Sequence, residues 1–195
     1  MTLRHLVEHG TWTHVPQDMT LAGDRLRVTA VEGSDAWRHT AYDMVRDSEH
    51  ALLEPFGAEA ALEVSFLLDY SAQYDQAGLF LRASEQEWIK AGVEVADGLA
   101  QVGAVVTHTY SDWSVAPVQE WIGREVTIRA SRAGDAITLR ARVDDEPFRL
   151  LRVAYLAPGT ELQAGLYCCA PSRAGLTVTF TGYTTGDADT TLHPE

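Results

Sequence analysis

Two ionisable side chains, Lys90 and Glu94, stand four residues apart in a segment that reads as a β-strand. Of the 15 basic residues in the chain, 14 are arginine and Lys90 is the only lysine. A compact ammonium and a planar guanidinium are not interchangeable, so the exception indicates a position where arginine does not serve. Four residues of a strand span roughly 13 Å, which is too far for a rigid direct pair. Lys90 and Glu94 could instead reach toward a ligand that lies between them.

Turn chemistry fixes how this strand pairs with its neighbours. Asp97-Gly98 is a favoured two-residue hairpin turn, and it joins strands that we predict over 87–95 and 99–107. A short connection over 84–86 joins a further strand, 76–83, to the first of these. One face of the three-stranded meander is then continuously apolar, which supports the register, because a slip by one residue would mix the two faces. The other face carries four rows: Gln76, Glu94 and Gln101; Gly78, Gly92 and Gly103; Phe80, Lys90 and Val105; Arg82, Trp88 and Thr107.

The row of glycines predicts a trough, since glycine inside a strand is tolerated where a ligand or another backbone approaches closely. Amides, a carboxylate, an ammonium and aromatic rings around it are typical of a carbohydrate or small polyol site. A covering loop, or long side chains that lean across and pair, would fill the trough instead. The loop 110–114 would stand at its mouth, or cap a turn and cover the core edge. The candidate ligand-binding residues are Gln76, Gly78, Phe80, Arg82, Trp88, Lys90, Gly92, Glu94, Gln101, Gly103, Thr107, Asp112 and Trp113.

The elements that position these residues are strands almost everywhere. Apolar and polar residues alternate over 25–30, 62–69, 137–143 and 176–181, which is the pattern of strands with one buried face. Short turn-forming clusters separate the strands, and no pattern predicts a helix of three turns. About ten to thirteen strands in one chain indicate a two-sheet sandwich or a closed barrel.

Several motifs of the sequence resemble those of a known family. They are Tyr74-Asp75-Gln76-Ala77-Gly78-Leu79, Glu87-Trp88-Ile89-Lys90-Ala91-Gly92-Val93-Glu94, Ser111-Asp112-Trp113-Ser114, Asp35-Ala36-Trp37-Arg38 and Ala170-Pro171-Ser172-Arg173-Ala174-Gly175, and the central block is specific. From about residue 10 to residue 183 the sequence resembles the regulation-of-enolase proteins, a family of domains of unknown function. What the resemblance implies is a concanavalin A-like jelly-roll sandwich of two antiparallel sheets, as in legume lectins and several glucanases, and no known reaction.

Three classes of function follow from these residues. Binding of a small carbohydrate-like or sugar-phosphate ligand on the concave sheet is the first. A protein-interaction module that acts on a metabolic enzyme such as enolase is the alternative that the resemblance implies. A carbohydrate-active enzyme with Glu94 as general acid or base is the third, and its other catalytic residues are unknown. The paired carboxylates of retaining glucanases are not expected, because the central strand offers one acid on this face. Glu94 with Asp75 or Asp112 is a conceivable wider pair.

Two further motifs could carry chemistry. His5, Glu8 and His9 match the H-x-x-E-H pattern of zinc peptidases, but that chemistry needs a helix and a third ligand. We expect a solvated leader there, and neither a metal nor another cofactor. Cys168 and Cys169 are adjacent, so in a strand their side chains point to opposite faces, and two reduced cysteines that pack in the interior are expected. For Trp12, Trp37 and Trp121 we expect core or sheet-edge packing.

The amino-acid composition limits the classes of partner that the protein can bind. The formal net charge is −13 at pH 7, which leaves no cationic field for nucleic acid or for anionic membranes. No apolar run is long enough for a membrane span, and no signal peptide is expected, so we predict a cytoplasmic protein. We expect a leader over 1–9, one sandwich domain over 10–183 and a flexible tail over 184–195, in which Asp187 and Asp189 are solvated.

Overall fold

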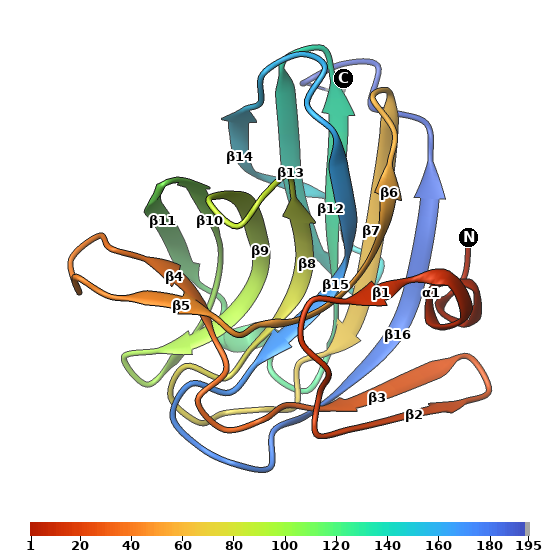
Figure 1. Ribbon diagram of the computed structural model, residues 1–195. Helices are drawn as coiled ribbons and strands as arrows, with labels where there is room; N and C mark the ends of the chain where they lie inside the picture. The colour runs from red at the N-terminus through yellow and green to blue at the C-terminus, as the bar shows by residue number, and fades with distance from the viewer. Residues whose placement is uncertain (194–195) are drawn as a thin grey trace.

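The computed structural model describes residues 1–193 and is built almost entirely of strands (Figure 1). A seven-stranded sheet, called the first sheet below, has the order β1-β6-β15-β8-β9-β10-β11, and a second sheet of seven strands has the order β14-β13-β12-β7-β16-β3-β2. The predicted jelly-roll sandwich of two antiparallel sheets is therefore confirmed. Its elements are α1 Leu3–His9, β1 Thr11–Trp12, β2 Asp18–Ala22, β3 Arg25–Thr29, β4 Ala36–Arg38, β5 Val45–Asp47, β6 His50–Phe56, β7 Ala60–Leu67, β8 Gln76–Arg82, β9 Glu87–Ala96, β10 Leu99–His108, β11 Tyr110–Pro117, the 3-10 turn Gln119–Trp121, β12 Glu125–Ala133, β13 Ala136–Val143, β14 Arg149–Tyr155, β15 Leu162–Cys169 and β16 Thr177–Gly186.

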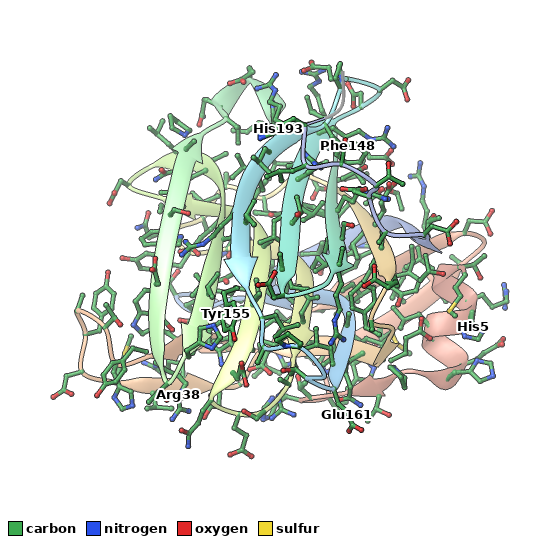
Figure 2. All side chains as sticks on the ribbon, turned by 90° about the horizontal axis from the view of Figure 1, so that it is seen from above. His5, Arg38, Phe148, Tyr155, Glu161 and His193 are labelled. Carbon is green, nitrogen blue, oxygen red and sulfur yellow. The ribbon has the colours of Figure 1, made fainter. Side chains whose placement is uncertain are left out.

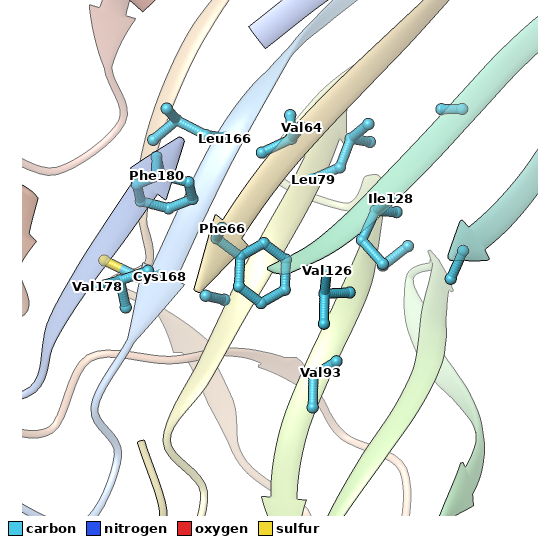
Figure 3. Packing of buried hydrophobic residues seen from close by; sticks show 14 of the residues in the cluster. Val64, Phe66, Leu79, Val93, Val126, Ile128, Leu166, Cys168, Val178 and Phe180 are labelled. Carbon is cyan, nitrogen blue, oxygen red and sulfur yellow. The ribbon is translucent and has the colours of Figure 1, made fainter. Parts of the chain in front are cut away.

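The main core lies between the inner faces of the two sheets (Figure 3). Alternate residues of β7 and β16, such as Phe66 and Phe180, point into it and are fully buried. Leu79 and Val93 meet them from the first sheet. Each such side chain contributes roughly 1.5–3 kcal/mol by leaving water, so this interface holds the first sheet in place and leaves its outer face available for other contacts.

The predicted register of the meander is confirmed row by row. Glu94 pairs with Gln76 on one side and Gln101 on the other, and Gly92 lies between Gly78 and Gly103. The turn between β9 and β10 has positive φ at both central residues, as a type I′ hairpin requires.

The three aligned glycines are required by the backbone itself. A Cβ atom at Gly78 would clash with the carbonyl oxygen of Ala91, and one at Gly92 would clash with that of Ala77. At Gly103 the obstacle is the carbonyl oxygen of Ser114 on β11. The close approach of neighbouring strands, and not of a ligand, therefore accounts for glycine in this row.

The N-terminal segment is part of the domain and not a solvated leader. Residues of α1 form a two-turn helix capped by Thr2, and Leu3 and Leu6 are buried in the main core. The motif with His5 and His9 thus does lie on a helix, with the two rings stacked 4.4 Å apart. Within residues 1–193, however, no group of three His, Cys, Asp or Glu side chains is placed to hold a metal ion. Figure 2 shows His5 at the end of the molecule opposite to Arg38 of β4.

The C-terminal segment also differs from the expectation. β16 extends to Gly186, and the carboxylate of Asp189 accepts hydrogen bonds from Arg129 and Arg140 at 2.7 and 3.1 Å, so this acid is not simply solvated. The last two residues of the predicted tail, 194 and 195, lie outside the described part of the chain. In the described part, no helix is long and apolar enough to cross a membrane.

Candidate functional site

A cavity of about 250 Å³ lies on the outer face of the first sheet, beneath the hairpin of β4 and β5. The hairpin extends away from the sandwich beside β10 and β11 (Figure 1). The floor comes from β8 and β9, and the walls come from the hairpin, from β11 and from three loops, which precede β4, precede β8 and follow β15. The lining residues are Gly33, Asp35, Trp37, Tyr42, Met44, Arg46, Tyr74, Gln76, Lys90, Glu94, Trp113, Pro171 and Ser172. We call this space the floor cavity.

Lys90 is buried at the bottom of the floor cavity and is fully engaged by its own chain. Its Nζ donates hydrogen bonds to Oε1 of Gln76 at 2.7 Å and to Oδ1 of Asp35 at 3.3 Å. Burial lowers the pKa of Lys90, but the carboxylates of Asp35 and Glu94 outweigh this effect and raise the pKa above its ordinary value. The side chain is therefore a charged ammonium that organises the floor, and not a neutral amine that could attack a carbonyl group.

Glu94 is the carboxyl group of the floor cavity whose pKa is shifted. Burial raises the pKa of its carboxyl from 4.5 to about 7, against the charge of Lys90 and with a contribution from the carboxylate of Asp35. No side chain or backbone group within residues 1–193 donates a hydrogen bond to it. A carboxyl group that is half protonated near neutral pH and lacks a partner can bind hydroxyl groups, or can take and give a proton.

Aromatic rings form the wall opposite the floor. Trp37 of β4 lies between Tyr42 and Trp113, with ring centroids at 5.7 and 6.3 Å and edge-to-face geometry. Its indole Nε1 donates to the carbonyl oxygen of Thr40 at 2.9 Å, which fixes the ring. The packing expected for Trp37 is present, because its ring is partly buried against the cluster that contains Phe80 and Trp88, and the same ring also lines the cavity.

Hydrogen bonds anchor the hairpin to the first sheet. The backbone N–H of Arg38 donates to Oγ of Ser111 at 2.9 Å, and that hydroxyl lies 2.9 Å from Oγ1 of Thr107. The guanidinium of Arg38 also pairs with Asp47 at 3.1 Å. The wall of the cavity is thus tied to β10 and β11. Residues 110–114, which we expected to form a loop, are the first part of strand β11 and supply this anchor through Ser111.

The predicted trough is filled by the protein itself. Tyr167 of β15 lies beside Gly78 in the sheet and is buried with Phe80, Trp88 and Val105 in a second apolar cluster. The Phe80 and Trp88 rings stack at 5.4 Å. Above Gly92 and Gly103 there remains a space of about 10 Å³, which suits at most one water molecule. Of the alternatives that the sequence left open, the structure therefore shows a trough filled by the protein's own side chains, and the open space lies beside it.

The structure brings four of the candidate residues together at the floor cavity and places the others elsewhere. Gln76, Lys90, Glu94 and Trp113 line the cavity. Gly92, Gln101 and Gly103 border the small space above the glycines. Away from both lie Gly78, Phe80, Trp88 and Thr107, which are buried, Arg82, which is half-buried, and Asp112, which is exposed and pairs with Arg152 at 3.2 Å.

Nine lining residues of the cavity were missed because they come from outside the meander, and four of these have side chains that could bind a ligand. Asp35, Trp37, Tyr42 and Arg46 lie in or next to the hairpin, which pairs only with itself and is too short to show strand periodicity. The signal that could have found two of them is the motif that contains Asp35 and Trp37, which belongs to the family resemblance.

Two other groups with possible chemistry are inert. Cys168 faces the main core and Cys169 the second cluster, so the predicted opposite orientation and reduced state are confirmed. Burial raises the pKa of Cys168 to about 12, which excludes a thiolate nucleophile at neutral pH. The buried Asp75 accepts hydrogen bonds from Nε of Arg173 at 3.1 and 3.2 Å, so its carboxylate is already engaged.

The fold and the site define a jelly-roll β-sandwich protein with a polar, aromatic-walled cavity on one sheet. The chain belongs to the family described as protein of unknown function (DUF1349), which matches residues 12–188. Regulation of enolase protein 1 from Saccharomyces cerevisiae is 32% identical over 174 residues, which cover 89% of this chain and 87% of that protein. The expected family membership is therefore confirmed.

Solved structures agree with this assignment. A functionally unknown protein from Saccharomyces cerevisiae superposes with a TM-score of 0.87 at 30% identity, covering 93% of this chain and 97% of that chain. The xylan beta-1,4-xylosidase from Bacillus halodurans C-125 superposes with a TM-score of 0.68 at 12% identity, covering 85% of this chain and 33% of that chain. The second likeness shows the fold alone.

Proposed function

We propose that the protein binds a small carbohydrate-like molecule in the floor cavity. The observation that carries the proposal is the Glu94 carboxyl, which is half-buried and lines the cavity without a hydrogen-bond donor among residues 1–193. A polar group that is shielded from water without a hydrogen bond is costly, and a ligand hydroxyl would satisfy it. The fixed amide of Gln76 and the ring of Trp37 supply the further polar and apolar contacts of a sugar site.

The charges of the floor favour a neutral sugar ring at its centre. Asp35 already offsets the ammonium of Lys90, so no free positive charge remains there for a phosphate group. A sugar phosphate would place its anionic group at the rim, where the guanidinium of Arg46 forms no ion pair with any residue in 1–193. Both ligands share the same ring position beside Glu94.

Calorimetric titration tests the proposal with free pentoses, free hexoses and hexose phosphates. We expect one or more of these to bind the wild-type protein, and Glu94→Gln to weaken binding by about tenfold to a hundredfold, as loss of a hydrogen bond to a charged group does. Glu85→Gln is the matched control, because Glu85 is exposed in the turn before β9. Failure of the whole panel to bind, or equal affinity in wild type and Glu94→Gln, overturns the proposal. A phosphate contribution that disappears in Arg46→Gln assigns the anionic end of the ligand.

Proton transfer at Glu94 is a second candidate function, and the pKa near 7 favours it. In that case Glu94→Gln abolishes turnover of the bound sugar while its affinity stays close to that of the wild type. The same variant therefore separates a catalyst from a binding protein, because a binding protein loses affinity and shows no turnover. Product formation by nuclear magnetic resonance is the measurement.

Action on enolase is the third candidate, and identity to Regulation of enolase protein 1 supports it. The contact surface would be the loops rather than the cavity. Purified enolase should then bind wild type and Glu94→Gln equally in calorimetry, and Lys90→Ala should bind as well as the wild type if it folds. The absence of any heat of binding contradicts this candidate and leaves the sugar site untouched.

A further inference from the structure

A second hollow lies against the floor cavity on the outer side of the hairpin and encloses about 560 Å³. Its lining includes Tyr110, Asp112 and Thr40, and it shares Trp37, Tyr42 and Trp113 with the floor cavity. We call it the outer hollow. Because three aromatic side chains belong to both spaces, a ligand that fills the floor cavity meets the same rings that begin the outer hollow.

The outer hollow has the composition of a sugar subsite of its own. Tyr110 is 64% exposed and Tyr42 is 57% exposed, so both side chains are accessible to a ligand. His39 lies beside Tyr110 with ring centroids 5.3 Å apart, which holds the tyrosine in place. The carboxylate of Asp112 is largely exposed although it pairs with Arg152, and it can accept hydrogen bonds from hydroxyl groups.

Size decides what can occupy both spaces at once. A cavity of about 250 Å³ is slightly smaller than the roughly 300–1,000 Å³ of pockets for drug-sized ligands, so it suits a single sugar ring. An occupant that continues into the outer hollow must be narrow, must begin with a polar ring beside Glu94, and must present flat apolar faces to aromatic rings. A folded protein surface cannot enter the floor cavity, whereas a chain of linked sugars fits each of these conditions.

We propose that the ligand is an oligosaccharide, with one terminal unit in the floor cavity and the following units on Tyr110 and Tyr42 in the outer hollow. This inference rests on the proposed function and adds the chain length of the ligand to it. Tyr110 is then a specificity-determining residue, because it contacts the second and third units and not the first.

Chain length is the variable that tests this inference. Xylose, glucose, galactose and mannose are each compared with their β-1,4-linked di- and trisaccharides by calorimetry. We expect the trisaccharide of the preferred sugar to bind about tenfold more tightly than the monosaccharide, which corresponds to about 1.4 kcal/mol. Tyr110→Ala should remove this gain and leave the affinity for the monosaccharide unchanged.

Matched variants keep the result interpretable. Tyr155→Ala removes a tyrosine of similar exposure, 61%, on β14, outside the lining of either cavity, and should leave the gain intact. Asp112→Asn provides a second, milder change in the outer hollow and should reduce the gain in part.

The possible failures are distinct. Equal affinity for monosaccharide and trisaccharide, or a gain that survives Tyr110→Ala, overturns the oligosaccharide inference and leaves the floor cavity as a monosaccharide site. Failure of every saccharide to bind overturns the proposed function as well. Enolase binding that is lost in Tyr110→Ala, without any effect of chain length, assigns the outer hollow to a protein partner instead.

Discussion

Two glutamates of the first sheet differ in their hydrogen-bond partners. Glu54 of β6 accepts a hydrogen bond from the hydroxyl of Tyr183 at 2.8 Å, and its other oxygen lies 3.3 Å from Nε2 of His5. Glu94 of β9 has a raised pKa and accepts no hydrogen bond from any part of the chain that the structure describes. Glu54 is buried and Glu94 is half-buried, so both carboxyls are shielded from water, but only Glu54 has partners among residues 1–193.

The difference separates a structural acid from a functional one. Glu54 ties α1 and β16 to the edge of the first sheet, and both of its oxygens are engaged. The network of Lys90, Gln76 and Asp35 is also complete, but it leaves Glu94 next to it without a donor. Completed polar groups stabilise a fold, whereas an incomplete group that faces a cavity marks a place where a ligand completes it.

The largest expected effect comes from breaking the network beside Glu94. Lys90→Met removes the ammonium, which leaves Oε1 of Gln76 without its donor. The carboxylate of Asp35 loses its ion pair and keeps only the neutral N–H donors of Ala36 and Gln76. We expect a loss of about 3 kcal/mol in the free energy of unfolding, as for a buried ion pair that loses one partner. Urea denaturation measures it, and Arg46→Met, at an exposed cation without an ion pair within residues 1–193, is the control. An unchanged stability would show that Lys90 is free for a ligand rather than engaged by the chain.

Glu94→Gln should change stability in the opposite direction, and only at higher pH. The carboxyl has a pKa of about 7 in the folded state and 4.5 as the ordinary value, so the folded state binds more protons between these values. The wild type therefore loses stability as pH rises from 4.5 to about 7. Between pH 5 and pH 8 this loss amounts to about 2 to 3 kcal/mol.

The glutamine variant lacks this titration. Its free energy of unfolding should match that of the wild type most closely near pH 5 and exceed it by about 2 kcal/mol at pH 8. Urea denaturation at the two pH values measures the difference. Parallel stability curves for the two proteins would mean that Glu94 is ionised over the whole range, and that its carboxylate has a partner or solvent that the geometry does not show.

The pairing of the strands that form the floor of the site could be predicted from the sequence, because the turns between these strands fix their register. The Asp97-Gly98 hairpin and the alternation on either side leave one register for three strands, so the neighbours of Lys90 and Glu94 in the sheet follow from the order of residues alone. The reason for the aligned glycines could not be predicted from the sequence, since the alternation of apolar and polar residues does not show how closely adjacent backbones approach. The position of Tyr167 could not be predicted either, because this residue belongs to β15, which is distant in the sequence and pairs with β8 at Gly78.

The wall of the site could not be predicted in the same way. In the hairpin, positive φ is adopted by His39, Ala41 and Asp43, and no glycine in this segment indicates a turn at the level of the sequence. Contacts between distant segments hold such elements in place, as when Ser111 accepts from the backbone of Arg38. Glu54 was missed for the same reason, because its hydroxyl partner lies 129 residues away.

The smallest expected effect on stability is that of a substitution at Glu54, the other glutamate of the comparison. Glu54→Gln keeps the shape of the side chain but replaces a charged acceptor by a neutral amide, which weakens the hydrogen bond from Tyr183 and the contact with His5. Because hydrogen bonds to charged groups are stronger than neutral ones, we expect a loss of about 1 kcal/mol in the free energy of unfolding at pH 8. At the same pH the same substitution at Glu94 should be stabilising, so the two glutamates give changes of opposite sign under one urea titration. If both variants gain stability, the cost of shielding a charge from water alone determines the stability change at both sites. The lack of a hydrogen-bond donor to Glu94 then carries no information about a ligand.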